Sequence, residues 1–195
     1  SRRQRQMCIR DRSFIGGAKI DHEIVDGVVD YWNDCDYFDK EEGHTGHGVD
    51  KSMKDSLDLT IPRYIKDKRI TAYIDALAEV TIKYVEHYHT LKSIKWDLLE
   101  DFNIQWYPRG GGFHSLHCER SNAHPQCAGR VMAWMTFLNT IETGGETYFE
   151  YQQCKVRASK GLTLIWPADW THFHKGCPAP NEEKMIITGW YDLTI

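Results

Sequence analysis

The run LTLIWPADWTHFHKGCPAPNEEKMIITGWYDL, residues 162–193, decides how this chain folds. Apolar stretches at 162–166, 171–175 and 184–191 are separated by Pro, Asp, Gly and Asn, a pattern that predicts short strands joined by turns. The same pattern begins near residue 101 and predicts four earlier strands, at residues 102–107, 130–138, 147–151 and 154–158. We therefore expect the second half of the chain to form a barrel or a double-sheet jelly roll.

The first half of the chain has a helical pattern instead. Apolar residues recur at three- and four-residue intervals within residues 22–33 and 70–92, which predicts two amphipathic helices. Between them, residues 34–56 are rich in Gly and charge, and we expect a lid or recognition loop there. Helices followed by many short strands indicate an α+β fold, a double-stranded β-helix (jelly-roll) core with N-terminal supporting helices.

Length and composition bound the domain organisation. The chain has 195 residues, of which 41% are hydrophobic and 12% aromatic. That composition excludes a disordered, collagen-like or coiled-coil protein and favours one packed domain. We expect this domain to span residues 13–195, with a helical part at 13–100 and the jelly roll at 101–195.

Residues 1–12 are set apart by their charge. They carry five Arg and one Asp, a net charge of +4, so the remaining residues sum to −8 within a total of −4. The stretch MCIRD at 7–11 resembles the translation of a sequencing-adapter oligonucleotide, and we expect residues 1–12 to be a non-native or disordered segment. The acidic remainder argues against nucleic acid as a partner.

The sequence also suggests where the protein resides. It contains no apolar run of the roughly 20 residues that a membrane-spanning helix needs, and no secretory signal opens it. Its six Cys include no C-x-x-C pair, which favours buried thiols over disulfides or a zinc finger. We expect a soluble cytoplasmic protein with no membrane partner.

His117 and Glu119 form the first candidate metal-binding pair. If both lie on one strand, residues two apart share a face about 7 Å apart and can reach one ion. A third ligand is offered within residues 171–178, THFHKGCP, by His172 or by His174. Two His and one carboxylate are the donor set of non-haem Fe(II) oxygenases, which leaves three coordination positions open.

Lys184 is the second unusual residue, because it opens the otherwise apolar run 184–190, KMIITGW. A buried ammonium without a partner is costly, so the lysine either extends to water at the start of a strand or binds an anionic group. A 2-oxo acid that chelates iron, such as 2-oxoglutarate, has a second carboxylate that needs such a cation when it is buried.

Several further motifs follow one another in order. They are Tyr107-Pro108 with Gly110-Gly111-Gly112, Phe137-Leu138-Asn139, Gly144-Gly145-Glu146-Thr147-Tyr148-Phe149, Lys160-Gly161, and His174 with Cys177-Pro178. With the residues above, they resemble the Fe(II)- and 2-oxoglutarate-dependent dioxygenases of the prolyl 4-hydroxylase-like type over residues 101–193. Two positions depart from the usual family pattern: Glu119 replaces an Asp, and Phe137 replaces a Tyr that many relatives have.

The resemblance implies a set of metal ligands. His117, Glu119 and His174 would bind the iron. His174 is preferred over His172 because it lies ten residues before Lys184, the spacing found in the family. His172 remains the alternative ligand.

The resemblance also implies how the cosubstrate is held. Lys184 would form a salt bridge with the distal carboxylate of 2-oxoglutarate, and Tyr107 and Thr188 would hydrogen-bond the cosubstrate. His114, three residues before His117, is expected on the opposite strand face and outside the ligand set.

The activity implied is hydroxylation of a C–H bond, with Fe(II), 2-oxoglutarate and O2 and with ascorbate as a candidate accessory reductant. Succinate and CO2 would be released. A prolyl residue in a peptide or a free amino acid is the expected substrate. Two alternatives are a non-catalytic jelly-roll binding module and a nucleobase-directed oxygenase. The latter is disfavoured because such relatives place Arg pairs after the distal His, and no Arg follows Arg157.

Overall fold

A computed structural model of the chain describes residues 13–46, 48–121 and 125–194. The N-terminal segment 1–12, which the sequence sets apart, lies outside the described residues, so the expectation for it stays a prediction. None of the described helices is long and apolar enough to cross a membrane.

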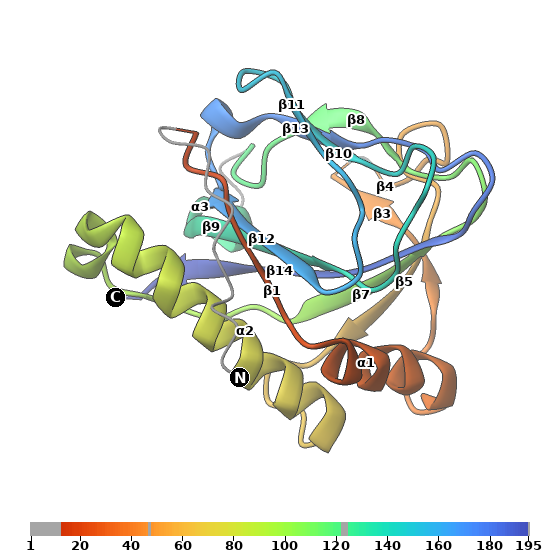
Figure 1. The fold of residues 1–195 in the computed structure, drawn as a ribbon, viewed down its shortest axis with the longest axis horizontal. Helices are drawn as coiled ribbons and strands as arrows, with labels where there is room; N and C mark the ends of the chain where they lie inside the picture. Colours follow the sequence, from red (N-terminus) through yellow and green to blue (C-terminus); the bar gives the residue numbers. More distant parts are fainter. Residues whose placement is uncertain (1–12, 47, 122–124, 195) are drawn as a thin grey trace.

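The larger of two facing sheets contains eight strands of the described chain, all paired antiparallel (Figure 1). Its order is β1 (Gly16–Lys19), β12 (Leu162–Pro167), β9 (Arg130–Phe137), β14 (Lys184–Leu193), β7 (Phe102–Tyr107), β5 (Leu57–Ile61) and β2 (Glu41–Glu42), and β6 (Trp96–Asp97) pairs with the end of β14.

The smaller sheet lies opposite the larger one (Figure 1). Its order is β11 (Cys154–Val156), β10 (Thr147–Phe149), β13 (His174–Gly176) and β8 (Phe113–His117). A separate short hairpin is formed by β3 (His44–Thr45) and β4 (Gly48–Val49). Two facing antiparallel sheets agree with the expected jelly roll.

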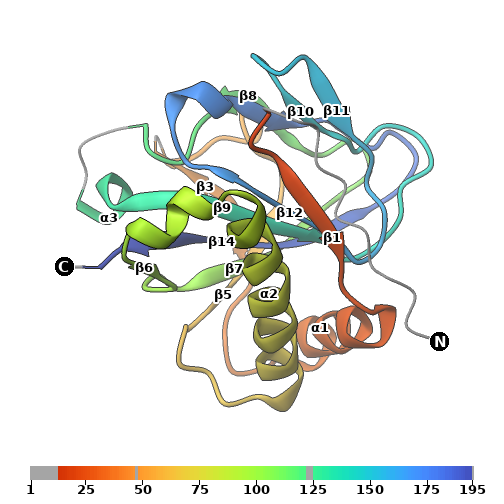
Figure 2. The same ribbon diagram turned by 60° about the vertical axis from the view of Figure 1, so that its left-hand side comes forward.

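Two long helices cover the outer face of the larger sheet, the face turned away from the smaller one (Figures 1 and 2). They are α1 (His22–Asp34) and α2 (Lys68–His87). The short elements of the described chain are η1 (His89–Ser93), α3 (Pro125–Ala128) and η2 (Trp170–His172). Asp67 precedes α2 as its N-cap, and its side chain accepts a hydrogen bond from the backbone N–H of Arg69.

Strand alternation divides the core into two layers. On β9, Met132 and Trp134 pack with the helices, whereas Ala133, Met135 and Phe137 pack between the two sheets. The helices cover one face of β9 and the smaller sheet covers the other, so this strand is buried along most of its length.

Strand β14 follows the same rule and positions the functional side chains. Ile187 and Tyr191 belong to the layer that packs with the helices. The alternate residues line a cavity between the sheets: Lys184, Ile186, Thr188 and Trp190. The two-residue period of one strand therefore directs a lysine inward.

The structure corrects two expectations about secondary structure. Residues 13–100 are not a purely helical part, because β1, β2, β5 and β6 from this region join the larger sheet. The strand expected at 171–175 is shifted to β13, and the residues before it form the turn η2. The predicted helices at 22–33 and 70–92 correspond to α1 and to α2 followed by η1.

Candidate metal centre and its two cavities

Three of the predicted ligands converge at the smaller sheet. His117 ends β8 and His174 begins β13, and the two residues are direct partners in the antiparallel pairing. Their ring centroids are 4.4 Å apart. With Glu119 they form a cluster whose potential ligand atoms all lie within 4.8 Å of one another. The structure thus brings together the three side chains that the sequence singled out.

Backbone carbonyls orient both imidazoles. The Nδ1 atom of His117 lies 3.0 Å from the carbonyl of Ser115, and that of His174 lies 2.9 Å from the carbonyl of His172. A carbonyl can only accept, so each Nδ1 carries a proton, and each Nε2 faces Glu119 as the ring atom that a metal ion could bind. Partial burial and the neighbouring His174 lower the pKa of His117 to about 4, which keeps this ring neutral.

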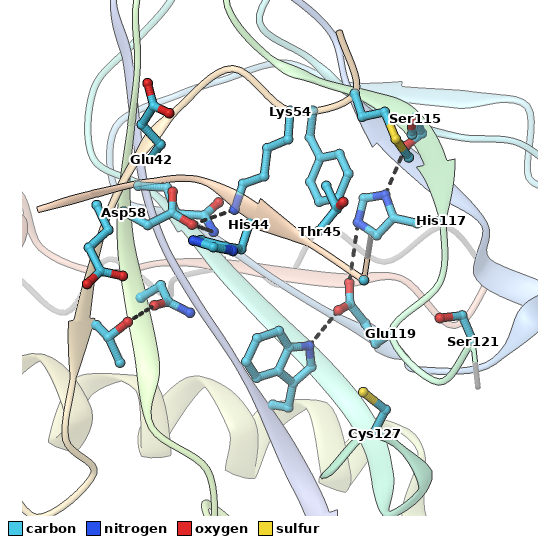
Figure 3. Close-up of a pocket in the computed structure, with 18 of the residues that line it drawn as sticks. Glu42, His44, Thr45, Lys54, Asp58, Ser115, His117, Glu119, Ser121 and Cys127 are labelled. Atoms are coloured by element: carbon cyan, nitrogen blue, oxygen red, sulfur yellow. Dashed lines mark hydrogen bonds and ion pairs between the residues drawn. The ribbon is translucent and has the colours of Figure 1, made fainter. Parts of the chain in front are cut away.

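Glu119 faces both imidazoles with one carboxylate oxygen, and Figure 3 shows its contact with His117. Its Oε1 lies 3.2 Å from Nε2 of His174 and 3.8 Å from Nε2 of His117. Its Oε2 accepts a hydrogen bond of 2.6 Å from the indole Nε1 of Trp190. Burial opposes ionisation of Glu119, but the interactions with the two histidines and Trp190 outweigh it and lower its pKa to about 2. The carboxylate is therefore charged and available to a cation.

The sequence pattern suggested that strand alternation places Glu119 beside His117. The structure shows a different route. Strand β8 ends at His117, and Glu119 lies two residues beyond it, in a bend. The extra methylene of Glu, compared with Asp, gives the side chain additional reach back toward the two imidazoles.

His172 and His114 do not join the cluster. His172 lies in η2, where its Nε2 is 2.9 Å from the carbonyl of Ser13 and its Nδ1 is 2.9 Å from the hydroxyl of Thr171. His172, the alternative ligand, therefore lies before β13 and does not share a strand face with His174. His114 lies within β8 and is not among the described residues that converge on Glu119.

An inner cavity of about 80 Å³ lies between the sheets, next to the cluster. Lys184 contributes to its wall and is only 3% exposed. Its ammonium nitrogen lies 3.4 Å from the carbonyl of Cys177, and no ion pair joins it to a carboxylate among the residues that the structure describes. Burial lowers the pKa of Lys184 to about 8. A buried cation with so little compensation is suited to pairing with an anion.

Tyr107 and Thr188 also line the inner cavity. The hydroxyl of Tyr107 donates to Oε1 of Gln105 at 2.7 Å, and that of Thr188 donates to the carbonyl of Trp134 at 2.8 Å. Burial raises the pKa of Tyr107 well above its usual value, so its hydroxyl stays protonated. Both hydroxyls donate their protons to protein acceptors. Each hydroxyl must therefore reorient before it can donate to a bound carboxylate.

A larger outer cavity of about 850 Å³ is also lined by residues of the cluster, His117 and Glu119 (Figure 3). Part of its wall comes from the region expected to form a lid or recognition loop, including Tyr37, Phe38, Glu41, Glu42 and His44. The two cavities share five lining residues, namely Gln105, Phe113, His117, Glu119 and Trp190. The candidate metal centre therefore forms the boundary between a small inner chamber and a large outer one.

Two functional neighbours were missed by sequence reasoning. Trp190 belongs to the inward-facing set of β14, so the two-residue alternation from Lys184 could have identified it. Phe113 stacks on the ring of His117, with centroids 3.8 Å apart and planes within 15°. Only the spatial arrangement reveals this contact, because aromatic residues are common throughout the chain.

Comparison with known proteins gives a consistent result. Residues 102–192 match the family model described as the 2OG-Fe(II) oxygenase superfamily. Among curated proteins, probable prolyl 4-hydroxylase 9 of Arabidopsis thaliana is 31% identical over 116 residues, which cover 47% of this chain and 40% of that protein. Prolyl 4-hydroxylase 13 of the same plant is 29% identical over 118 residues, with 48% and 43% covered. The chain thus spans less than half the length of these relatives.

Solved structures extend the likeness to nearly the whole chain. A viral collagen prolyl hydroxylase from Paramecium Bursaria Chlorella virus-1 matches with a TM-score of 0.69 at 16% identity, covering 94% of this chain and 98% of that one. A prolyl hydroxylase from Trichoplax adhaerens, solved with a hypoxia inducible factor peptide fragment, matches with a TM-score of 0.67 at 18% identity, covering 87% and 76%. At these identities the likeness confirms the fold, a double-stranded β-helix.

Proposed function

We propose, from the premise that residues 102–192 form a 2OG-Fe(II) oxygenase domain of the prolyl hydroxylase-like type, that this chain is an Fe(II)- and 2-oxoglutarate-dependent dioxygenase. One observation carries the proposal. A buried Lys184, with no carboxylate paired to it in the described part of the chain, shares a small cavity with His117, Glu119 and His174. The other cosubstrate would be O2, with ascorbate as an accessory reductant.

The donor set fits Fe(II). Two imidazole nitrogens and one carboxylate oxygen match the facial arrangement that non-haem Fe(II) oxygenases use, and such a set leaves three coordination positions for other ligands. Bound together, Fe(II) and 2-oxoglutarate would activate O2, which is the oxidant: one of its oxygen atoms enters the C–H bond of the substrate, and the other enters succinate as 2-oxoglutarate loses CO2. The chain's own contribution is to hold, orient and enclose these groups.

Each part of the site has a distinct task in this proposal. His117, Glu119 and His174 hold the metal. Lys184 binds the distal carboxylate of 2-oxoglutarate, which offsets the cost of burying its ammonium group. Apolar walls such as Trp166, which is 2% exposed, exclude water from the inner cavity. The outer cavity receives the substrate next to the metal centre.

We further propose a prolyl residue in a peptide as the substrate, in preference to a free amino acid. The outer cavity, at about 850 Å³, lies near the upper end of the range for drug-sized ligands and is far larger than one amino acid requires. Its lining carries more carboxylates, at Asp39, Glu41, Glu42 and Asp58, than cations, at Lys54 and Arg130, and this excess disfavours the phosphates of a nucleic acid. The plant relatives named above are prolyl 4-hydroxylases, which favours the same substrate class.

The test is anaerobic addition of Fe(II) and 2-oxoglutarate to the purified protein. We expect a weak visible charge-transfer band, which His117→Ala and Lys184→Ala should each abolish. A wild-type protein without the band, or variants that retain it unchanged, would exclude the oxygenase function and favour a non-catalytic binding module. Mass spectrometry of Pro-containing peptides, with free proline as the comparison, then identifies the substrate through a gain of one oxygen atom.

A further inference from the structure

The second oxygen of Glu119 is held away from the metal centre. Oε1 faces the two imidazoles, at 3.2 and 3.8 Å from their Nε2 atoms. Oε2 accepts the 2.6 Å hydrogen bond from Nε1 of Trp190. The two oxygens of one carboxylate therefore have different partners, and only one of them points at the candidate ion.

Trp190 is itself held in place by Arg130. The guanidinium carbon of Arg130 lies 3.6 Å from the centroid of the Trp190 ring, which is a close cation–π stack. One guanidinium nitrogen of Arg130 also donates to the backbone carbonyl of Glu119 at 3.3 Å, and the same nitrogen lies 4.0 Å from Oε2. Arg130 thus contacts both the indole and the residue that the indole binds.

Glu100 completes the arrangement by fixing the guanidinium. Its carboxylate accepts two hydrogen bonds from Arg130, at 2.7 and 2.6 Å. The pair is only about 10% exposed on each side, so this bidentate contact is well shielded from water. Glu100, Arg130, Trp190 and Glu119 therefore form one continuous chain of contacts that ends at the metal centre.

This chain of contacts has a chemical consequence for a glutamate. A carboxylate can bind an ion through one oxygen or through both, and binding through both occupies two coordination positions. The long side chain of Glu119 brings both oxygens near the ion unless one is engaged elsewhere. A dioxygenase of the proposed type needs three positions free of protein ligands.

We propose that Trp190 and Arg130 are positioning residues that hold Glu119 as a ligand through Oε1 alone. The inference rests on the proposed function, because it concerns the same metal site. The indole N–H occupies Oε2, and the guanidinium holds the indole plane against rotation. The coordination positions that 2-oxoglutarate and O2 require are kept free by this arrangement.

Co(II) binding to the purified protein tests the inference, because the visible d–d bands of Co(II) respond to coordination number without any turnover. Trp190→Phe keeps an aromatic ring but removes the N–H donor. We expect it to weaken Co(II) binding by about tenfold or more and to change the d–d spectrum, as is usual when a group that orients a metal ligand is lost. Arg130→Lys keeps the charge but loses the flat stacking surface and the bidentate contact, and should shift both readouts in the same direction.

Trp106→Phe is the matched control. The indole Nε1 of Trp106 also donates to a carboxylate, that of Glu183 at 3.1 Å, but this pair is absent from both cavities. Its Co(II) affinity should stay within twofold of wild type, with an unchanged spectrum. Thermal unfolding of the metal-free variants shows whether each is folded.

The outcomes separate this inference from the proposed function. A wild-type protein that binds neither Co(II) nor Fe(II) would overturn both. A wild-type protein that gives the 2-oxoglutarate charge-transfer band, while Trp190→Phe and Arg130→Lys keep the wild-type Co(II) affinity and spectrum, would overturn the inference alone. Should Trp190→Phe prove unfolded, Arg130→Lys decides by the same two measurements.

Discussion

Lys184 and Tyr107 are direct partners across the pairing of β14 with β7, and the ammonium nitrogen lies 4.8 Å from the centroid of the tyrosine ring. Directly opposed residues in an antiparallel pair share one face, so both side chains enter the inner cavity. The ring offers the ammonium a cation–π contact but no countercharge. An anionic ligand would supply that charge, and this makes Lys184 the most informative residue to test.

Binding of 2-oxoglutarate should weaken as the pH rises above about 8. Burial lowers the pKa of Lys184 to about 8 in the free protein, and a neutral amine cannot pair with a carboxylate. The dissociation constant should therefore rise by on the order of tenfold per pH unit above that value. Calorimetric titration of Mn(II)-loaded protein with 2-oxoglutarate at pH 7, 8.5 and 9.5 measures it. Lys184→Arg, which stays charged throughout, is the comparison, and a wild-type affinity that does not vary with pH would contradict the assignment.

Replacing Lys184 by an apolar residue should weaken the binding of 2-oxoglutarate without lowering the stability of the fold. Lys184→Met removes the ammonium but keeps a side chain of similar length. We expect the binding free energy of 2-oxoglutarate to fall by about 2–5 kcal/mol, the range found when one partner of a buried charge pair is removed. Metal affinity should stay close to that of wild type. Urea unfolding of the ligand-free protein should show equal or greater stability, because a desolvated charge is gone. A strongly destabilised variant would mean that Lys184 serves mainly the fold.

Replacement of His174 and replacement of His172 should differ sharply in their effect on metal affinity. His174→Ala removes an imidazole that faces Glu119 at 3.2 Å and should abolish detectable Co(II) binding. His172→Ala removes a ring that faces the carbonyl of Ser13 instead, so its metal affinity should stay within a few-fold of wild type. Equilibrium Co(II) titration of both variants provides the measurement. Loss of binding in His172→Ala with retention in His174→Ala would reverse the ligand assignment.

The contribution of one carboxyl group, that of Asp192, to the free energy of unfolding should decline as the pH rises from about 4 to above 7. Burial, together with the neighbouring Glu100, raises the pKa of Asp192 to about 7. A raised pKa means that the folded state holds a proton that the unfolded chain has already released, so this contribution is complete at low pH and is lost as the pH passes through 7. Urea unfolding at pH 5 and pH 8 should show that the free energy of unfolding of Asp192→Asn, relative to that of wild type, is higher at pH 8 than at pH 5. Asp30→Asn, on the exposed side of α1, should follow wild type.

Gly189 should tolerate no side chain. A Cβ atom there would lie 2.5 Å from Cζ2 of Trp134 and 2.8 Å from Cβ of Phe102. Gly189→Ala is expected to lower the free energy of unfolding by about 1–3 kcal/mol, as overpacking usually does. Gly46→Ala, where the added Cβ meets nothing within 4 Å, is the control and should change stability by less than about 0.5 kcal/mol. Equal unfolding midpoints for the two variants would show that the layer between β14 and the helices can relax.

Local sequence patterns predicted much of the fold. The alternation in β7, β9, β12 and β14 predicted these strands within one or two residues at each end. Strands β1 and β5 were missed because each is a short run, four or five residues long, in a region dominated by helical periodicity. Their pairing is long-range: β1 joins β12, more than 140 residues later in the chain. Nothing within GGAK indicates such a partner.

By itself, the sequence determined which residue types were available for chemistry, and the two-residue period of β14 directed Lys184 inward. Only the tertiary structure decided that Glu119, in a bend rather than on a strand, joins His117 and His174. It also decided that Trp190 donates a hydrogen bond to the second oxygen of that carboxylate and that Arg130 stacks on Trp190. The physical reason is that alternation depends on neighbours in the chain, whereas convergence depends on which strands pair and where a bend places a side chain, and residues distant in sequence fix both.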